Sequence, residues 1–420
     1  MVILKIGLLF LLIVLLLRLK VPLSISILVA GFLLGIWFNL GIRGIGDSVI
    51  GALGAEETVS LVTVVGIILI FSELLQASGQ LTALSKLIVE TFGLHRLTYT
   101  ILPIIVGLLP MPGGALFTAP LMDDVDEESI PAHKKTLINY WFRHIWEYAW
   151  PLYPGLVLAA GLARVNLNTL SVIQSPFIII SFVSGMILIF PGIKIVPHIT
   201  YYSAQQRRKL CAGLIKMGYL LLPIFIIIIL FMAVRLPMLI SLLIGLGWII
   251  LTALVKRQLG IKSILKVIFA KMHVYQMIFI VISVMVFSGI LQSSTLTADL
   301  SKFFSGGQAH QIPFIYMMLS VILLPLIVGL LTGLTVAFVG ITFPIIFTTI
   351  IPGGIDILPM AMLAYVSGIS GIMLSPLHLC LVLTNQYYKS SLIRVYKYLV
   401  PVVLIVLVIA ITICGLHFVL

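Results

Sequence analysis

The chain has 420 residues, of which 61% are hydrophobic and 9% are charged, and its mean hydropathy is +1.26. This composition is typical of a polytopic, all-α membrane protein and excludes a soluble globular domain. The formal net charge of +12 would suggest a nucleic-acid partner in a soluble protein, but here the basic residues lie in short loops between apolar runs. We therefore expect them to set the orientation in the lipid bilayer, with no nucleic-acid partner.

Ten apolar runs are each about long enough to cross a bilayer core of roughly 30 Å, the first only marginally. The first run has no small-residue cleavage site, so we interpret it as a helix and not as a signal peptide. Two further apolar segments contain helix-breaking residues. The predicted spans are 3–17, 21–40, 57–77, 136–162, 173–190, 217–234, 238–255, 272–292, 358–385 and 398–419, and the two other segments are 98–122 and 313–350.

The second half of the chain repeats the first. The stretch "FSELLQASGQLTALSK" from Phe71 matches "FSGILQSSTLTADLSK" from Phe287, and "LPIIVGLLPMPGG" from Leu102 matches "LPLIVGLLTGLT" from Leu324. Further matches follow in the same order, which indicates an internal duplication. We expect a first repeat over 1–192, a cytoplasmic linker over 193–216 and a second repeat over 217–420.

Basic loops predict the topology. The loops 191–216 and 256–271 hold five Lys or Arg residues each, so both should face the cytoplasm. Loop 386–397 is also basic, and the number of spans between these loops requires segment 313–350 to enter and leave on one side. The same reasoning makes 98–122 a re-entrant hairpin, because its first arm is too short to cross. A proline-kinked span at 98–122, or two full spans at 313–350, are the alternatives.

Each repeat then holds five spans and one hairpin. Because five is odd, the second repeat is inverted relative to the first, and both termini lie outside a multi-pass protein of the cell membrane. Inverted repeats whose broken segments meet near the bilayer midplane are the architecture of secondary transporters.

Three stretches carry a family resemblance. They are "GLLPMPGGALFTAPLM" from Gly107, "YWFRHIWEYAWPLYPG" from Tyr140 and "SGISGIMLSPLHLCLVL" from Ser367. With them the chain resembles domain-of-unknown-function family 401 of the ion transporter superfamily, which also holds divalent-anion/sodium symporters, gluconate permeases and large TRAP transporter subunits. The resemblance covers nearly the whole chain. It implies a homodimer with a static scaffold domain, a mobile transport domain that moves like an elevator, and a substrate site formed by hairpin tips and broken helices.

The two hairpin tips are candidate binding elements. Breaks there leave backbone amides and carbonyls without helical partners, and helix N-termini at the breaks favour an anionic ligand. The candidate residues are Pro110, Met111, Pro112, Gly113 and Gly114 in the first tip and Thr332, Gly333 and Thr335 in the second.

The span 136–162 is unusual because it places charge inside the membrane. Arg143, Glu147 and Trp150 recur on one helix face, with His144 beside them, and Pro151 should open the helix near Glu147. Ionisable residues at this depth are costly and usually functional. The alternative is a structural pair of Arg143 and Glu147.

The span 358–385 is the repeat partner of 136–162 and has no full charge. Its glycines permit close approach, its hydroxyls supply hydrogen bonds and its proline opens the helix. The candidates are Ser367, Gly368, Ser370, Gly371, Ser375, Pro376 and His378. The three cysteines are far apart and predict neither a disulfide framework nor a metal cluster.

These features predict a secondary active transporter of a small anionic solute, most plausibly an organic acid, with Arg143 as the charge partner and no catalytic residue, metal or other cofactor. Glu147 and His144 favour a proton as coupling ion, whereas the hydroxyls of Thr332, Thr335, Ser370 and Ser375 favour Na⁺. The competing hypothesis is a membrane-embedded enzyme that uses His144 and Glu147 as metal ligands or acid–base groups.

Overall fold

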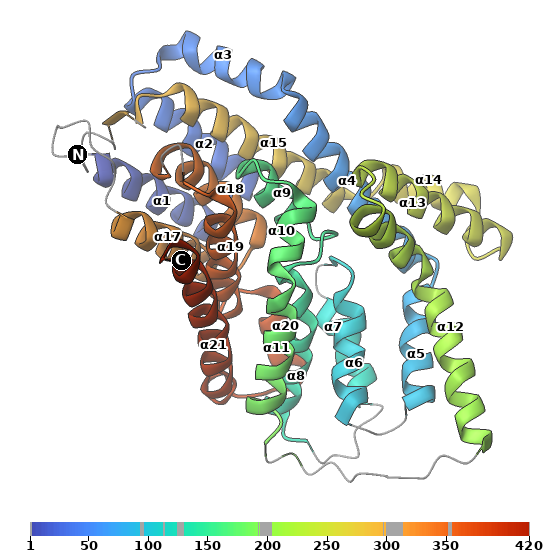
Figure 1. Cartoon of the computed structure of the whole chain (residues 1–420). Coiled ribbons are helices and arrows are strands. Elements are labelled where there is room, and N and C mark those ends of the chain that lie inside the picture. The colour runs from blue at the N-terminus through green and yellow to red at the C-terminus, as the bar shows by residue number, and fades with distance from the viewer. Residues whose placement is uncertain are drawn as a thin grey trace.

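The computed structural model describes residues 2–92, 96–111, 114–123, 130–191, 193, 204–296, 298–299, 314–351 and 355–419. These residues form helices and no β-strand, so the predicted all-helical fold is confirmed (Figure 1). A helix satisfies its own backbone hydrogen bonds, and this is why a chain of such apolar composition folds into helices.

Seven helices among the described residues are long and apolar enough to cross a membrane. They are Glu56–Ala77, Leu167–Leu188, Arg208–Ala233, Met238–Val255, Ile261–Ser293, Phe314–Thr332 and Leu392–Phe418. Six of them coincide with predicted spans. The seventh, α17 (Phe314–Thr332), is an arm of the segment 313–350. Its 19 residues span about 28 Å at 1.5 Å per residue, so by length this arm also fits the alternative of a full span.

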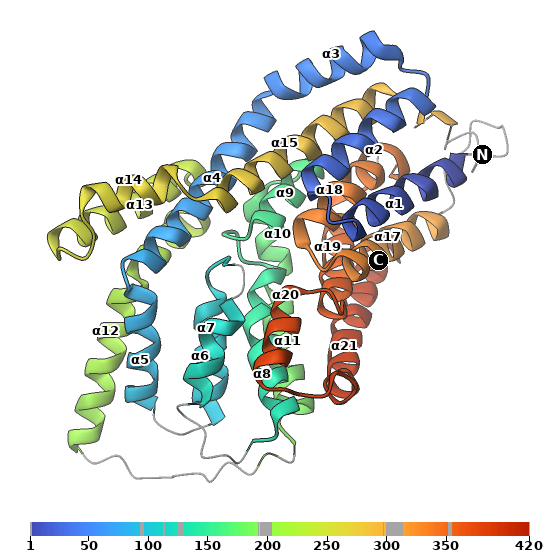
Figure 2. The same cartoon turned by 180° about the vertical axis from the view of Figure 1, so that it is seen from behind.

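One group of helices comes from the beginning of each half. It comprises α1 (Val2–Arg18), α2 (Leu23–Trp37), α3 (Gly41–Gly54), α4 (Glu56–Ala77) and α5 (Gln80–Phe92), then α12 (Ala204–Ile228, continued by the π-helical turn η2, Ile229–Ala233), α13 (Met238–Val255), α14 (Ile261–Phe269) and α15 (Met272–Ser293). Helix α15 packs along α2 and α3 and also contacts α4, while α12 lies beside α5 (Figure 2). Three short helices, α3, α5 and α14, were not predicted, because none of them forms a long apolar run.

A second group comes from the rest of each half. In the first half it comprises α6 (Arg96–Gly107), α7 (Gly114–Asp123), α8 (Ala132–His144), the 3₁₀ turn η1 (Ile145–Tyr148), α9 (Pro154–Leu162), α10 (Leu167–Gln174) and α11 (Pro176–Leu188). In the second half it comprises α17, α18 (Thr335–Ile345, continued by the π-helical turn η3, Ile346–Ile350), α19 (Ile357–Met373), α20 (Leu379–Tyr387) and α21 (Leu392–Val419).

The two halves of the second group are packed crosswise. Helices α6 and α7 contact each other, as do α17 and α18, so both predicted hairpin segments are helical hairpins. The second arm of the first hairpin, α7, packs against α20, the last piece of the second broken helix. The second arm of the second hairpin, α18, packs against α9, the last piece of the first broken helix. Each hairpin therefore closes around the end of the opposite broken helix.

Glycines allow the first arm of each hairpin to approach its own broken helix. A Cβ at Gly107 in α6 would overlap the carbonyl of Arg143 in α8. A Cβ at Gly371 in α19 would overlap the carbonyl of Leu326 in α17. Only glycine permits such backbone-to-backbone contact. The contact holds four helix interruptions close together: the two hairpin tips and the openings of the two broken helices.

Candidate functional site

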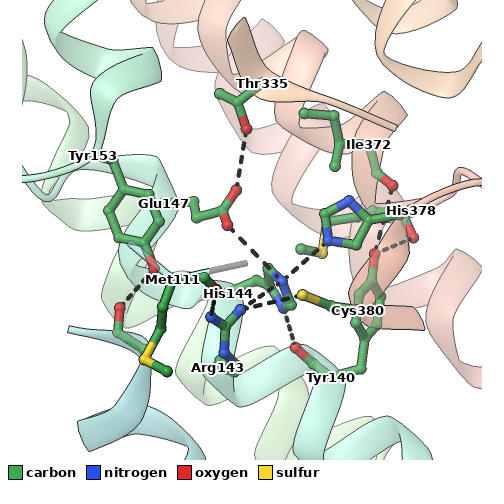
Figure 3. Close-up of polar contacts among 12 residues, drawn as sticks. Met111, Tyr140, Arg143, His144, Glu147, Tyr153, Thr335, Ile372, His378 and Cys380 are labelled. Carbon is green, nitrogen blue, oxygen red and sulfur yellow. Dashed lines mark hydrogen bonds and ion pairs between the residues drawn. The ribbon is translucent and has the colours of Figure 1, made fainter. Parts of the chain in front are cut away.

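Arg143 lies at the centre of the four helix interruptions. Its side chain comes from the last turn of α8 and the residue is only 2% exposed. The guanidinium donates from Nη2 to the carbonyl of Met111 in the first hairpin tip (2.7 Å) and from Nη1 to Sγ of Cys380 in α20 (3.4 Å). A Cβ at Gly114 would collide with the same group. One side chain thus joins the first hairpin tip to the second broken helix (Figure 3).

One donor of this guanidinium has no partner. Nε of Arg143 is buried and makes no hydrogen bond within the described residues. A buried unpaired donor costs about 1–3 kcal/mol, and more when the group is charged. Native proteins rarely leave such a donor unpaired, so this nitrogen is available to donate to a water molecule or to a bound acceptor.

The first broken helix opens as its proline predicts. Because Pro151 has no N–H and crowds the preceding turn, α8 ends at His144, a single 3₁₀ turn follows, and α9 begins at Pro154, where the missing N–H is tolerated. Glu147 is on this 3₁₀ turn and is 6% exposed. Its Oε2 accepts a hydrogen bond from Thr335 of the second hairpin (3.4 Å), and its Oε1 is 3.8 Å from Nε2 of His144.

Two histidines, one from each broken helix, face each other. Nε2 of His144 and Nε2 of His378 are 3.2 Å apart, and both residues are buried. Nδ1 of His378 lies 2.9 Å from the carbonyl of Gly333 in the second hairpin tip. Gly333 has φ +65°, a left-handed conformation that favours glycine, and a Cβ there would also clash with the backbone of His378.

Two tyrosines hold the broken helices in place. The hydroxyl of Tyr140 donates to the carbonyl of Met373 (3.2 Å), and its ring packs against both imidazoles at centroid distances of 4.7 Å to His144 and 5.5 Å to His378. The hydroxyl of Tyr153 donates to the carbonyl of Gly107 (2.6 Å). These bonds fix the break of α8 to α19 on one side and to α6 on the other.

The structure gathers some of the predicted site residues and leaves others apart. Those around the common centre are Met111, Gly114, Arg143, His144, Glu147, Gly333, Thr335 and His378. Three prolines lie in the helix interruptions: Pro110, Pro151 and Pro376, of which Pro376 is exposed. Pro112 and Gly113 lie outside the described residues.

The other predicted residues are engaged within the fold or lie apart from this centre. The hydroxyls of Thr332 and Ser370 donate to carbonyls of their own helices, at Val328 (2.7 Å) and Val366 (2.8 Å). The ring of Trp150 packs against that of Trp146 in a tilted arrangement, with ring centroids 4.8 Å apart. Four more predicted residues lie along α19 or at its end. Gly368 packs against the ring of Phe338 and Gly371 against Leu326. Ser375 accepts from the amide of Leu377, and the buried hydroxyl of Ser367 has no partner among the described residues.

Cys380 is a site residue that the sequence did not indicate. We expected no cluster around the cysteines, but Cys380 lies beside Arg143, two residues after His378. Its position just past the Pro376 break was the available signal. A buried cysteine commonly serves as a small apolar residue, so composition alone does not single it out.

The same cluster has the donor atoms of a metal site. One ligand atom each from His144, His378 and Cys380 lie within 4.8 Å of one another. Nitrogen and sulfur donors of this kind suit Zn²⁺. However, Nη1 of Arg143 already lies 3.4 Å from the sulfur and 3.2 Å from Nε2 of His144. Because a fixed cation occupies the space beside two of the three donors, we do not assign these residues as metal ligands.

The fold and the site together define a class: a multi-pass helical membrane protein with buried charged groups where two hairpins and two broken helices meet. A family model described as "Protein of unknown function (DUF401)" matches residues 3–416. The chain belongs to this family. A search among curated proteins found no match.

Proposed function

We propose that this protein is a secondary active transporter of a small anionic solute, an organic acid, in the cell membrane. The observation that carries the proposal is Arg143, a buried guanidinium with an unpaired Nε, held between the first hairpin tip and the second broken helix. A guanidinium offers a carboxylate two parallel hydrogen bonds. An ionisable side chain inside a membrane-spanning segment is a usual mark of a substrate or ion pathway.

The transport mechanism that we propose is elevator-type alternating access in a homodimer. Two inverted repeats would place the hairpins symmetrically around one site, and the crosswise packing of α7 with α20 and of α18 with α9 supports this arrangement. The mobile transport domain would consist of α6–α11 and α17–α21. The static scaffold would consist of α1–α5 and α12–α15.

For the coupling ion we favour a proton over Na⁺. The ionisable groups of the site, Glu147 and the two histidines, are buried together. Glu147 is the carrier that the sequence suggests, with His144 beside it.

The test is uptake and binding with Arg143→Gln. A thermal-shift screen of carboxylates and oxyanions first selects the anion that stabilises the purified parent most. Losing one partner of a buried charge-assisted interaction costs about 2–5 kcal/mol, so we expect affinity for that anion to fall by at least ~30-fold while the protein stays folded. Arg43→Gln, in the exposed part of α3, is the matched control. Unchanged affinity in Arg143→Gln contradicts the proposal.

The inverted topology can be tested separately by cysteine labelling on intact cells. If the second repeat is inverted, single cysteines at Ala163 and near Gly353 should react with an impermeant reagent from outside. A cysteine at Asp126 should react only from inside. Outside labelling at position 126 would mean that the first hairpin crosses the membrane.

The second candidate function is a membrane-embedded metal enzyme. The proximity of His144, His378 and Cys380 is the observation that favours it. Such an enzyme should purify with about one metal ion per chain. Metal analysis of the purified protein therefore separates the two candidates, since the transporter as proposed needs no resident metal.

A further inference from the structure

The backbone determines which nitrogen of each facing histidine carries the hydrogen when the ring is neutral. Nδ1 of His144 lies 2.5 Å from the carbonyl of Tyr140, and Nδ1 of His378 lies 2.9 Å from the carbonyl of Gly333. A carbonyl oxygen can only accept, so each Nδ1 must carry a hydrogen. A neutral imidazole has a single N–H, and each Nε2 is therefore an acceptor whenever its ring is neutral.

Two neutral rings are disfavoured in this geometry. Their Nε2 atoms would bring two lone pairs together at 3.2 Å with no hydrogen between them. One added proton converts the contact into an N–H···N hydrogen bond of ordinary length. Nε2 of His144 also lies 3.2 Å from Nη1 of Arg143, which can only donate. The single lone pair of Nε2 of His144 therefore accepts from both Arg143 and His378 in a three-centre arrangement, and the proton belongs on Nε2 of His378.

We propose that His144 and His378 together hold one proton between their Nε2 atoms, and that this proton, rather than one on Glu147, is the coupling ion of the transporter. The second half of this statement rests on the proposed function. The proton comes from water, forms an N–H bond at Nε2 of His378 and returns to water when it leaves.

The surrounding charged and titratable groups are consistent with such a site. From α8 and η1 the pair faces Arg143, Glu147 and the phenol of Tyr140, and from α20 it faces the thiol of Cys380. The first hairpin contributes the carbonyl of Met111 to Arg143, and the second contributes Gly333 and Thr335, none of which titrates. Glu147 is the one acidic side chain among these groups and offsets one positive charge.

Charge accounting then links the proton to the solute. If Glu147 is ionised and the thiol and phenols are neutral, Arg143 and Glu147 cancel, so the site without the extra proton has no net charge. With the proton the site carries +1. A net charge buried at this depth is costly, and a monovalent anion removes it. Proton and anion therefore favour each other's binding, and this coupling is reciprocal. Transport should be electroneutral, with one proton moving per monovalent anion.

The proton site can be observed without knowing the solute. The probe is the proton itself, followed by ¹⁵N NMR of the full chain labelled at histidine, between about pH 5 and about pH 8. We expect Nδ1 to be protonated in both rings and one shared N–H···N signal between the Nε2 atoms. The pair should gain or lose one proton as a unit. The parent alone decides the outcome, so a variant that fails to fold does not remove the test.

Variants assign the signal. In His378→Asn the amide nitrogen can still donate to Gly333, but nothing replaces Nε2, so the shared signal should disappear. His417→Asn is the matched control, because His417 is exposed and pairs with Asp356. Two rings that titrate independently, or Nε2 atoms bound to a tightly held metal ion, would overturn the inference.

Vesicle measurements separate this inference from the proposed function. Uptake of the anion selected by thermal shift should follow a pH gradient and ignore an imposed membrane potential. If uptake occurs while the rings titrate independently, the inference fails and the transporter stands. If the shared proton is present but no anion from the screen is taken up, the proton site stands and transport fails.

Discussion

The two broken helices that meet at the site are built in different ways. The first carries the charged pair: Arg143 lies in the last turn of α8, and Glu147 lies in the 3₁₀ turn that follows His144. The second contributes His378 and Cys380, and its first piece, α19, is buried over nearly its whole length. One half thus provides the electrostatics of the site, and the other half provides a tightly packed wall.

The repeat alignment predicted from the sequence offers a reason why the two halves differ in these roles. When Tyr140 is paired with Tyr365, Arg143 falls opposite Gly368. A Cβ at Gly368 would already collide with the ring of Phe338. The second half therefore has no room for an arginine at the equivalent position, and substitutions in the two halves should fail in different ways.

The largest effect should come from the charged half. Glu147→Gln removes the carboxylate that balances Arg143, so uptake driven by a pH gradient alone should be lost. Reconstituted vesicles with an inward proton gradient measure this, and Glu56→Gln in the exposed first turn of α4 is the control. If parent uptake instead requires a sodium gradient and ignores pH, proton coupling is wrong.

The packed half should respond through stability. Gly371→Ala places a Cβ against the carbonyl of Leu326, and such overpacking typically costs about 1–3 kcal/mol. We expect a lower thermal unfolding temperature in detergent. Gly247→Ala, on an exposed position of α13 with nothing within 4 Å of the added Cβ, should not lower it. Equal behaviour of the two variants would show that α17 and α19 are not closely packed.

A charge-preserving substitution sharpens the role of Arg143. Lysine keeps the positive charge but cannot contact Met111 and Cys380 at once with a planar, forked group. We expect Arg143→Lys to bind the selected anion about tenfold more weakly than the parent, yet more tightly than Arg143→Gln. Isothermal titration gives the three affinities. If lysine binds as well as arginine, the site needs only a point charge.

The smallest effect should separate two threonines in the second hairpin. Thr335 donates to Glu147, whereas Thr332 donates to its own helix. Removing the hydroxyl of Thr335 costs about 1 kcal/mol, so Thr335→Val should change the half-saturating proton concentration for uptake several-fold. Thr332→Val should leave that concentration unchanged. The opposite pattern would place the ion site in the hydroxyls of the second hairpin.

The sequence was informative where a residue type is unusual for the segment that contains it. Arg143 and Glu147 stand out because charge is rare in an apolar run, and Pro151 marks the opening that the structure places between His144 and Pro154. Cys380 is an ordinary residue type in an apolar segment and was therefore not predicted as a site residue. The hydroxyls of Thr332 and Ser370 looked free in the sequence, because a bond to the preceding helical turn leaves no pattern in it.

The helices of the first group show the same limit. Apolar runs located α4, α13 and α15 closely, whereas α3, α5 and α14 have no such run and were not predicted. Helix length alone does not determine whether α17 spans the bilayer or returns to the side from which it enters. That depends on the tilt of the helix and on the helices packed against it.

The crosswise packing also constrains how the protein is made. Helix α7 is complete at Asp123, but its partner α20 begins only at Leu379, about 250 residues later. At roughly 5–20 residues per second, synthesis of that interval takes on the order of 10–50 s. During this time α8, with its lysines, histidines and Arg143, has no second half to cover it and is poorly suited to lipid. The nascent first half must therefore wait at the membrane, shielded by the insertion machinery or by water, until the end of the chain arrives.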